Sequence, residues 1–149
     1  MRILMLSDVY FPRVNGVSAS MRTFARDLVR RGHEVTVVAP SYGPEDQIEE
    51  FELIRLPSRR IFFDPEDRLI KASALRAVLP RLQARHFDVI HIQTPFRAHQ
   101  LGTRLSRITG IPTVETYHTY FEQYVSHYLP WLPARALRSG ARWMSRRLG

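Results

Sequence analysis

The chain opens with the run Arg2-Ile3-Leu4-Met5-Leu6-Ser7, which is apolar almost throughout and is typical of a strand buried on both faces of a parallel sheet. From residue 17 to residue 31 the apolar side chains recur at spacings of three and four, which predicts a helix, and Gly32 follows as its stop. Residues 33–40, His-Glu-Val-Thr-Val-Val-Ala-Pro, predict a β-branched strand that ends at a proline. Together these segments predict a right-handed βαβ unit.

The same alternation continues along the chain. Further strands are predicted at residues 51–56, 88–93 and 112–116, and further helices at 69–85 and 98–109. Pro80 lies inside the first of these helix patterns and is expected to kink or end it, while Gly110 stops the second. We therefore predict an α/β fold with a doubly wound, Rossmann-like parallel sheet in one domain that fills residues 1–149, and we take 3-2-1-4-5 as its strand order.

The composition fits one globular domain and excludes several kinds of chemistry. Of the 149 residues, 44% are hydrophobic and 24% are charged, and none is cysteine. Disulfides, thiolate zinc sites and cysteine nucleophiles are thereby excluded, and a reducing cytoplasm is the expected compartment. The apolar start is too short for a signal peptide or a membrane span.

The charge of the chain indicates an anionic partner. The formal net charge is +8, which suits nucleic acid, anionic lipid or a phosphorylated small molecule. The alternative is a basic surface without a specific partner. The net charge alone does not distinguish this alternative from an anionic partner.

The predicted topology places a ligand site at one edge of the sheet. Ligands of doubly wound sheets bind beyond the carboxyl ends of the strands, where the strand order reverses. That crevice lies between the first strand and the strand at 88–93. Its walls are the segments Val9–Ser18, Thr94–Arg97 and the residues from Tyr117 onward.

The first wall carries Asn15-Gly16 at the start of a helix. One glycine in a long loop does not make a dinucleotide-binding fingerprint, which needs three at fixed spacing. A helix start does offer free N–H groups and a positive dipole end to a phosphate, and a glycine allows close approach. The alternative is a simple N-cap in which Asn15 or Ser18 satisfies the first turn.

The other two walls carry polar residues at strand ends. His91 alternates with isoleucines, and we interpret it as a satisfied core histidine; Thr94 and Pro95 follow where that strand breaks. In the third wall His118 stands between hydroxyl residues just past a strand end, which core packing does not readily explain.

These segments together resemble the retaining glycosyltransferases of family 4, which have the GT-B fold of two facing Rossmann-like domains. The resemblance covers the whole chain and only the first half of a family member. It is carried by the opening strand with Phe11-Pro12-Arg13-Val14-Asn15-Gly16-Val17, and by residues 31–37, 88–95 and 116–119.

The resemblance implies roles for particular residues. It implies that His118 lies against the transferred sugar as the catalytic residue, and that the donor diphosphate or the acceptor is contacted by Asn15, Gly16, Val17, Thr94, Pro95 and Tyr117. Many members have two glycines where this chain has Asn15-Gly16, so the role of Asn15 is open. Since the family's donor-binding carboxylates lie in a second domain, we expect this chain to be catalytically incomplete alone.

The reaction implied is transfer of a sugar from a nucleoside diphosphate sugar with retention at the anomeric carbon. The protein would orient the substrates and stabilise the departing diphosphate. No cofactor beyond the nucleotide sugar is predicted. No metal is predicted either, because the chain has no Asp-x-Asp motif and residues 64–67 are typical of a solvated turn.

The carboxyl-terminal segment suggests a lipid acceptor. Residues 117–128 look most like diacylglycerol glucosyltransferases, and a basic amphipathic helix is predicted beyond Pro133. Its candidate membrane or acceptor surface comprises Arg135, Arg138, Arg142, Trp143 and Arg146. The alternative is that its apolar stripe packs on the sheet or on a second domain. Nucleic acid is not predicted, because no recognised module accompanies the charge.

The sequence favours one function and leaves two alternatives. The favoured function is the amino-terminal half of a glycosyltransferase with a lipid or envelope glycan acceptor, expected in the cytoplasm or as a peripheral protein at the inner face of the cell membrane. The first alternative is a stand-alone membrane-docking module. The second is half of a sugar-nucleotide epimerase, which shares the GT-B architecture.

Overall fold

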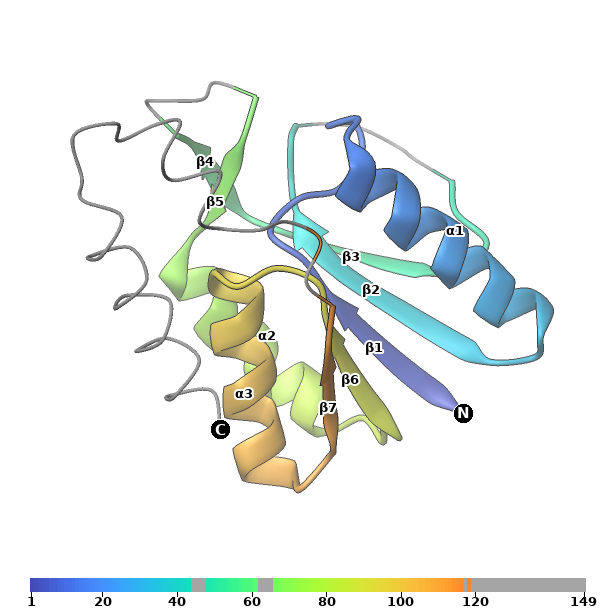
Figure 1. Cartoon of the computed structure of the whole chain (residues 1–149). Coiled ribbons are helices and arrows are strands. Elements are labelled where there is room, and N and C mark those ends of the chain that lie inside the picture. Colours follow the sequence, from blue (N-terminus) through green and yellow to red (C-terminus); the bar gives the residue numbers. More distant parts are fainter. Residues whose placement is uncertain (44–47, 62–65, 117, 119–149) are drawn as a thin grey trace, which may run out of the picture. The chain divides into compact units, whose positions relative to one another are not determined.

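The computed structural model describes residues 1–43, 48–61, 66–116 and 118, and the chain divides into two compact units, Met1–Thr116 and Tyr117–Gly149. Every helix and strand described below lies in the first unit (Figure 1). In chain order they are β1 (Arg2–Leu6), α1 (Gly16–Arg30), β2 (Glu34–Pro40), β3 (Glu52–Leu56), β4 (Ser58–Arg60), β5 (Arg68–Ile70), α2 (Ala72–Gln83), β6 (Val89–Ile92), α3 (Arg97–Thr109) and β7 (Thr113–Glu115).

The main sheet has five strands in the order β3-β2-β1-β6-β7, and each pairs in parallel with its neighbours. The predicted order 3-2-1-4-5 is thus confirmed. In the register, Leu4 stands opposite Thr36 of β2 on one side and Ile90 of β6 on the other. The strand order reverses at β1 and β6, as the prediction required.

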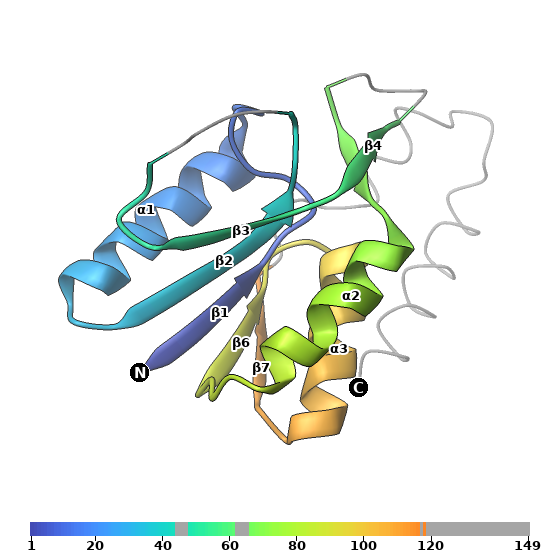
Figure 2. The same ribbon diagram turned by 180° about the vertical axis from the view of Figure 1, so that it is seen from behind.

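The central strand β1 is buried on both faces of the sheet. Leu4 and Leu6 belong to a core cluster that includes α2 and α3, whereas Ile3 and Met5 belong to a second cluster with α1. Figures 1 and 2 show α1 on one face of the sheet and α2 and α3 on the other. This double burial is the physical reason for the continuous apolar run of the opening strand.

The two predicted glycine stops are confirmed. Gly32, just after α1, and Gly110, the C-cap of α3, have left-handed φ angles of 83° and 75°. At the end of α1 the amides of Gly32 and His33 donate to the carbonyls of Val29 and Leu28. These bonds satisfy carbonyl groups that the helix end would otherwise leave open.

The predicted helix at 69–85 was wrong at its start. Leu69 and Ile70 belong to β5, which pairs antiparallel with β4 in a two-stranded ribbon, and α2 begins only at Ala72. Ile70 is buried in the core, so its apolar character serves a strand rather than a helix. Pro80 lies in the last turn of α2, which ends at Gln83, so few helical hydrogen bonds remain beyond the proline.

Among the helices that the structure describes, none combines the length and the apolar character needed to cross a bilayer.

Candidate functional site

The predicted crevice is at the carboxyl ends of β1 and β6, which pair side by side. The chain leaves β1 toward β2 and leaves β6 toward β7, so the segments that follow these two strands diverge from the same edge of the sheet. They are the loop before α1 and the loop before α3. Both were predicted as walls of the site.

Asp8 joins these two loops across the crevice. Its amide donates to Oγ1 of Thr94 at 2.8 Å, and the same hydroxyl donates to Oδ2 of Asp8 at 2.7 Å. The carboxyl group also accepts hydrogen bonds from the amides of Arg97 at 3.0 Å and Ala98 at 3.1 Å. Asp8 therefore caps the start of α3. It does so although Asp8 and Thr94, which stands just before that helix, are 86 residues apart in the chain.

The electrostatics of Asp8 follow from its burial. Burial raises the pKa of the Asp8 carboxyl above its ordinary value, although the hydrogen bonds from Thr94, Ala98 and Arg97 act in the opposite direction. Because the Asp8 oxygens occupy the first turn of α3, that helix end is already satisfied within the protein. The start of α1 is consequently the better place for an external phosphate.

The predicted site residue Thr94 has a structural function in this arrangement. Its hydroxyl both donates to and accepts from Asp8, and only 9% of the residue is exposed. Pro95 follows it and is half-buried. A direct contact of either residue with a ligand stays a prediction.

Asn15 is the N-cap of α1, as the alternative interpretation held. Its Oδ1 accepts a hydrogen bond from the amide of Ser18 at 2.8 Å, and its carbonyl accepts from Ala19 at 3.0 Å. Within the described part of the chain, no residue accepts a hydrogen bond from the amides of Gly16 and Val17. These two amides lie at the positive end of the helix dipole.

Gly16 has free space around it. A Cβ added there would meet no atom within 4 Å, and its φ angle is one that ordinary residues adopt. Neither packing nor backbone geometry of the described residues therefore demands a glycine at this position. Its side-chain-free surface is available to a ligand that approaches the helix start. Val17, in contrast, packs against the core cluster beneath α1.

The loop before α1 is fastened to neighbouring segments by arginines. Arg55 of β3 donates to the carbonyls of Phe11 at 2.6 Å and Pro40 at 3.1 Å. Arg13 pairs with Glu66 and with Asp67, whose Oδ1 lies 3.2 Å from its Nε. Glu66 is exposed and lies in a turn, as predicted for residues 64–67, and with Asp67 it also holds the loop through Arg13.

A buried ion cluster supports the same loop from the side of α1. The side chain of Glu49 is fully buried and contacts Arg22 at 3.0 Å and Arg26 at 3.2 Å. It also accepts a hydrogen bond from the hydroxyl of Tyr10 at 3.1 Å. Burial, together with the charge of Glu49, raises the pKa of Tyr10, so this phenol is neutral at physiological pH.

Two imidazole contacts mark the ends of β6 and β7. His91 is half-buried and its Nε2 lies 2.7 Å from Oγ1 of Thr116, which supports its interpretation as a structural histidine. Nδ1 of His99 on α3 lies 2.9 Å from Oε1 of Glu115. The second pair was not predicted, because its one signal in the sequence is the position of Glu115 at the end of a strand.

The remaining predicted site residues lie in the second unit. His118 is partly buried, and this desolvation lowers the pKa of its imidazole, which favours the neutral form at pH 7. Its catalytic role stays a prediction. Six predicted site residues lie outside the described part of the chain, namely Tyr117, Arg135, Arg138, Arg142, Trp143 and Arg146.

Fold and crevice together define an α/β protein of the Rossmann-like class found in GT-B glycosyltransferases. The sequence profile described as Glycosyltransferase Family 4 matches residues 14–148, and the chain belongs to this family. The family resemblance drawn from the sequence is thereby confirmed.

Individual relatives agree with this assignment. The chain is 36% identical over 129 residues to the alpha-monoglucosyldiacylglycerol synthase of Streptococcus pneumoniae, covering 87% of this chain and 29% of that protein. It is 32% identical over 140 residues to a GDP-mannose-dependent alpha-mannosyltransferase of Mycobacterium tuberculosis, covering 91% and 36%. The chain thus spans about a third of the length of these relatives.

A solved structure shows the same fold. Sucrose-phosphate synthase from Thermosynechococcus elongatus superposes with a TM-score of 0.55 at 19% identity, over 83% of this chain and 34% of that one. At this identity the likeness concerns the architecture alone.

Proposed function

We propose that this chain is the amino-terminal half of a retaining glycosyltransferase that transfers a sugar from a nucleoside diphosphate sugar to a lipid or envelope glycan acceptor. Its family membership and relatives named for glucosyldiacylglycerol synthesis and GDP-mannose-dependent transfer support this reaction. The observation that carries the proposal is the unobstructed start of α1 at Gly16, beside the switch point of the sheet.

The proposed chemistry needs little from the protein beyond position and charge. As the bond between sugar and diphosphate breaks, negative charge grows on the leaving phosphate oxygens. The amides of Gly16 and Val17 and the positive end of the α1 dipole would stabilise that charge. The Asp8 and Thr94 link and the arginine contacts hold these groups in place. His118 would contact the sugar, with Asn15, Thr94, Pro95 and Tyr117 near the substrates.

A membrane-facing role is part of the proposal. The predicted basic helix with Arg135, Arg138, Arg142, Trp143 and Arg146 would bring the enzyme to an anionic lipid surface, at the cytoplasmic side. Each arginine near such a surface contributes on the order of 1 kcal/mol. Sedimentation with phosphatidylglycerol vesicles, with and without residues 134–149, tests this role. Equal binding by both forms would contradict it.

The transfer reaction is tested in a chimaera that joins this chain to the carboxyl-terminal part of the Streptococcus pneumoniae synthase. We expect it to transfer glucose from UDP-glucose to a diacylglycerol acceptor, because the half taken from the glucosyldiacylglycerol synthase supplies most of the donor site. Gly16→Ala should lower turnover at least about tenfold while the fold stays intact, because the new methyl group would occupy the proposed position of the donor phosphate at the start of α1. His118→Ala should lower it similarly.

The matched control is Val14→Ala in the same loop. Val14 is 74% exposed, and its truncation should leave turnover unchanged. A folded chimaera that transfers no glucose would overturn the proposed reaction. Normal turnover of Gly16→Ala would overturn the phosphate site at α1.

A further inference from the structure

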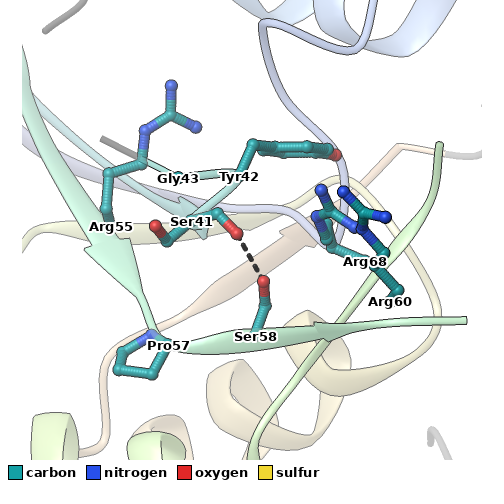
Figure 3. Close-up of a pocket in the computed structure, with 8 residues that line it drawn as sticks. All are labelled: Ser41, Tyr42, Gly43, Arg55, Pro57, Ser58, Arg60 and Arg68. Carbon is teal, nitrogen blue, oxygen red and sulfur yellow. Dashed lines mark hydrogen bonds between the residues drawn. The ribbon is translucent and has the colours of Figure 1, made fainter. Parts of the chain in front are cut away.

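A cavity lies at the carboxyl ends of β2 and β3. It has a volume of about 500 Å³, and Ser41, Tyr42, Arg55, Ser58, Arg60 and Arg68 are among the residues that line it (Figure 3). Three of these side chains are guanidinium groups, and no described lining residue is acidic. The lining therefore carries a net positive charge, and the serines add neutral polar groups to it.

Two of the arginines stand directly opposite each other. In the antiparallel ribbon Arg60 of β4 pairs with Arg68 of β5, and both line the cavity. Like charges at directly opposite positions destabilise a two-stranded ribbon. The intervening position Arg59 pairs with Leu69, and Arg59 is absent from the lining. The ribbon thus concentrates positive charge on the face that borders the cavity.

Arg68 also has a buried N–H donor from which no described residue accepts a hydrogen bond. Its guanidinium lies 5.3 Å from the centroid of the Tyr42 ring, which fixes its orientation. Its Nη1 is buried, and none of the described residues accepts a hydrogen bond from it. A buried arginine donor without an acceptor costs free energy that an oxyanion in the cavity would recover.

Arg55 separates this cavity from the loop before α1. Two of its nitrogens donate to the carbonyls of Phe11 and Pro40, so this guanidinium is held in place and adds charge to the cavity wall. Hydrogen bonds to an anion in the cavity are consequently assigned to Arg60 and Arg68.

We propose that this cavity binds a phosphate group through Arg60 and Arg68, at a position separate from the start of α1. Paired guanidinium groups match the oxygens of a phosphate in geometry and charge. The phosphate belongs either to the head group of an anionic phospholipid or to a small soluble molecule. The inference concerns binding by this chain alone and does not depend on the proposed sugar transfer.

The test is a calorimetric titration of the 149-residue chain with inorganic phosphate and, separately, with glycerophosphoglycerol, the deacylated phosphodiester head group. We expect saturable binding that Arg60→Ala and Arg68→Ala each weaken at least about tenfold, the loss of one charge-assisted contact. The matched control is Arg59→Ala, which removes the same charge from the same strand outside the cavity.

The outcomes separate the possibilities. Tighter binding of the phosphodiester assigns the site to a lipid head group, and tighter binding of inorganic phosphate assigns it to a soluble phosphate compound. Equal weakening by Arg59→Ala, or no saturable binding of either probe, would overturn the proposal. Because Arg60 is exposed, Arg60→Ala should fold and decides the matter even if Arg68→Ala does not.

Discussion

Gly102 of α3 packs so closely on Ile92 of β6 that a Cβ added to the glycine would lie 2.6 Å from Cδ1 of the isoleucine. Cδ1 of Leu6 in β1 would be 3.1 Å away. This close contact holds α3, the helix whose start Asp8 caps, against β6 and β1.

Gly102→Ala should therefore destabilise the fold by about 1–3 kcal/mol, because the new methyl group forces the helix or the isoleucine to move. Gly16→Ala is the matched control, since its methyl group meets no atom of the described chain and should leave the stability unchanged or slightly raised. Urea denaturation of both variants measures the difference. Equal stabilities would contradict the packing described here.

Asp8→Asn should cost about 1–3 kcal/mol of stability. One carboxylate oxygen of Asp8 accepts from Thr94 and Ala98, and the other accepts from Arg97. In asparagine an NH₂ group replaces one of these oxygens, so in either orientation of the amide a donor faces a donor. Asp27→Asn on the exposed part of α1 removes the same charge and should change stability by less than about 0.5 kcal/mol. Thermal denaturation at neutral pH compares them.

Glu52 should make stability depend on pH in the acidic range. Burial works to raise the pKa of Glu52, but hydrogen bonds from Arg85 and Thr36 and the charges of Arg85 and Arg81 outweigh it, so the pKa lies below the ordinary 4.5. The ionised form is thus favoured in the folded state. Its contribution is complete above pH 4.5 and is lost as the pH falls through the lowered pKa.

The measurement compares the wild-type chain with Glu52→Gln in urea at several pH values. We expect the difference in unfolding free energy to be constant from pH 6 to 8 and to shrink below about pH 4.5. A difference that stays the same down to pH 3 would contradict the assignment.

Arg55→Lys should loosen the loop before α1 while keeping the charge. A lysine ammonium does not reproduce the fork that reaches the carbonyls of both Phe11 and Pro40. Faster amide hydrogen exchange in residues 9–15 is the expected result, and Arg59→Lys should leave that exchange unaltered. Unchanged exchange in both variants would show that the loop is held by other contacts.

The sheet could be predicted because its signals are local. Each strand is a short apolar run and each of α1 and α3 ends at a glycine, Gly32 or Gly110, so periodicity and breakers were sufficient to predict the alternation of strands and helices. The strand order was taken from the usual topology of doubly wound sheets, and the structure agrees with it. The Asn15-Gly16 helix start was found for the same reason.

What the sequence did not reveal depends on residues far apart in the chain. Asp8 and Thr94 are 86 positions apart, and the residues around each of them give no signal for the hydrogen bond between the two. The β4 and β5 ribbon was missed because three-residue strands have no measurable period, and the apolar Leu69 and Ile70 continue smoothly into a helical pattern. The cavity between Arg60 and Arg68 exists only once that ribbon has formed.

The Asp8 carboxyl group ties two loops to one helix through hydrogen bonds within the protein. The rim of the crevice is therefore preorganised, and a substrate that binds there loses little affinity to the ordering of backbone. Any large closing motion during a catalytic cycle would then be a movement of this rim as one piece, with the hinge located elsewhere in the polypeptide.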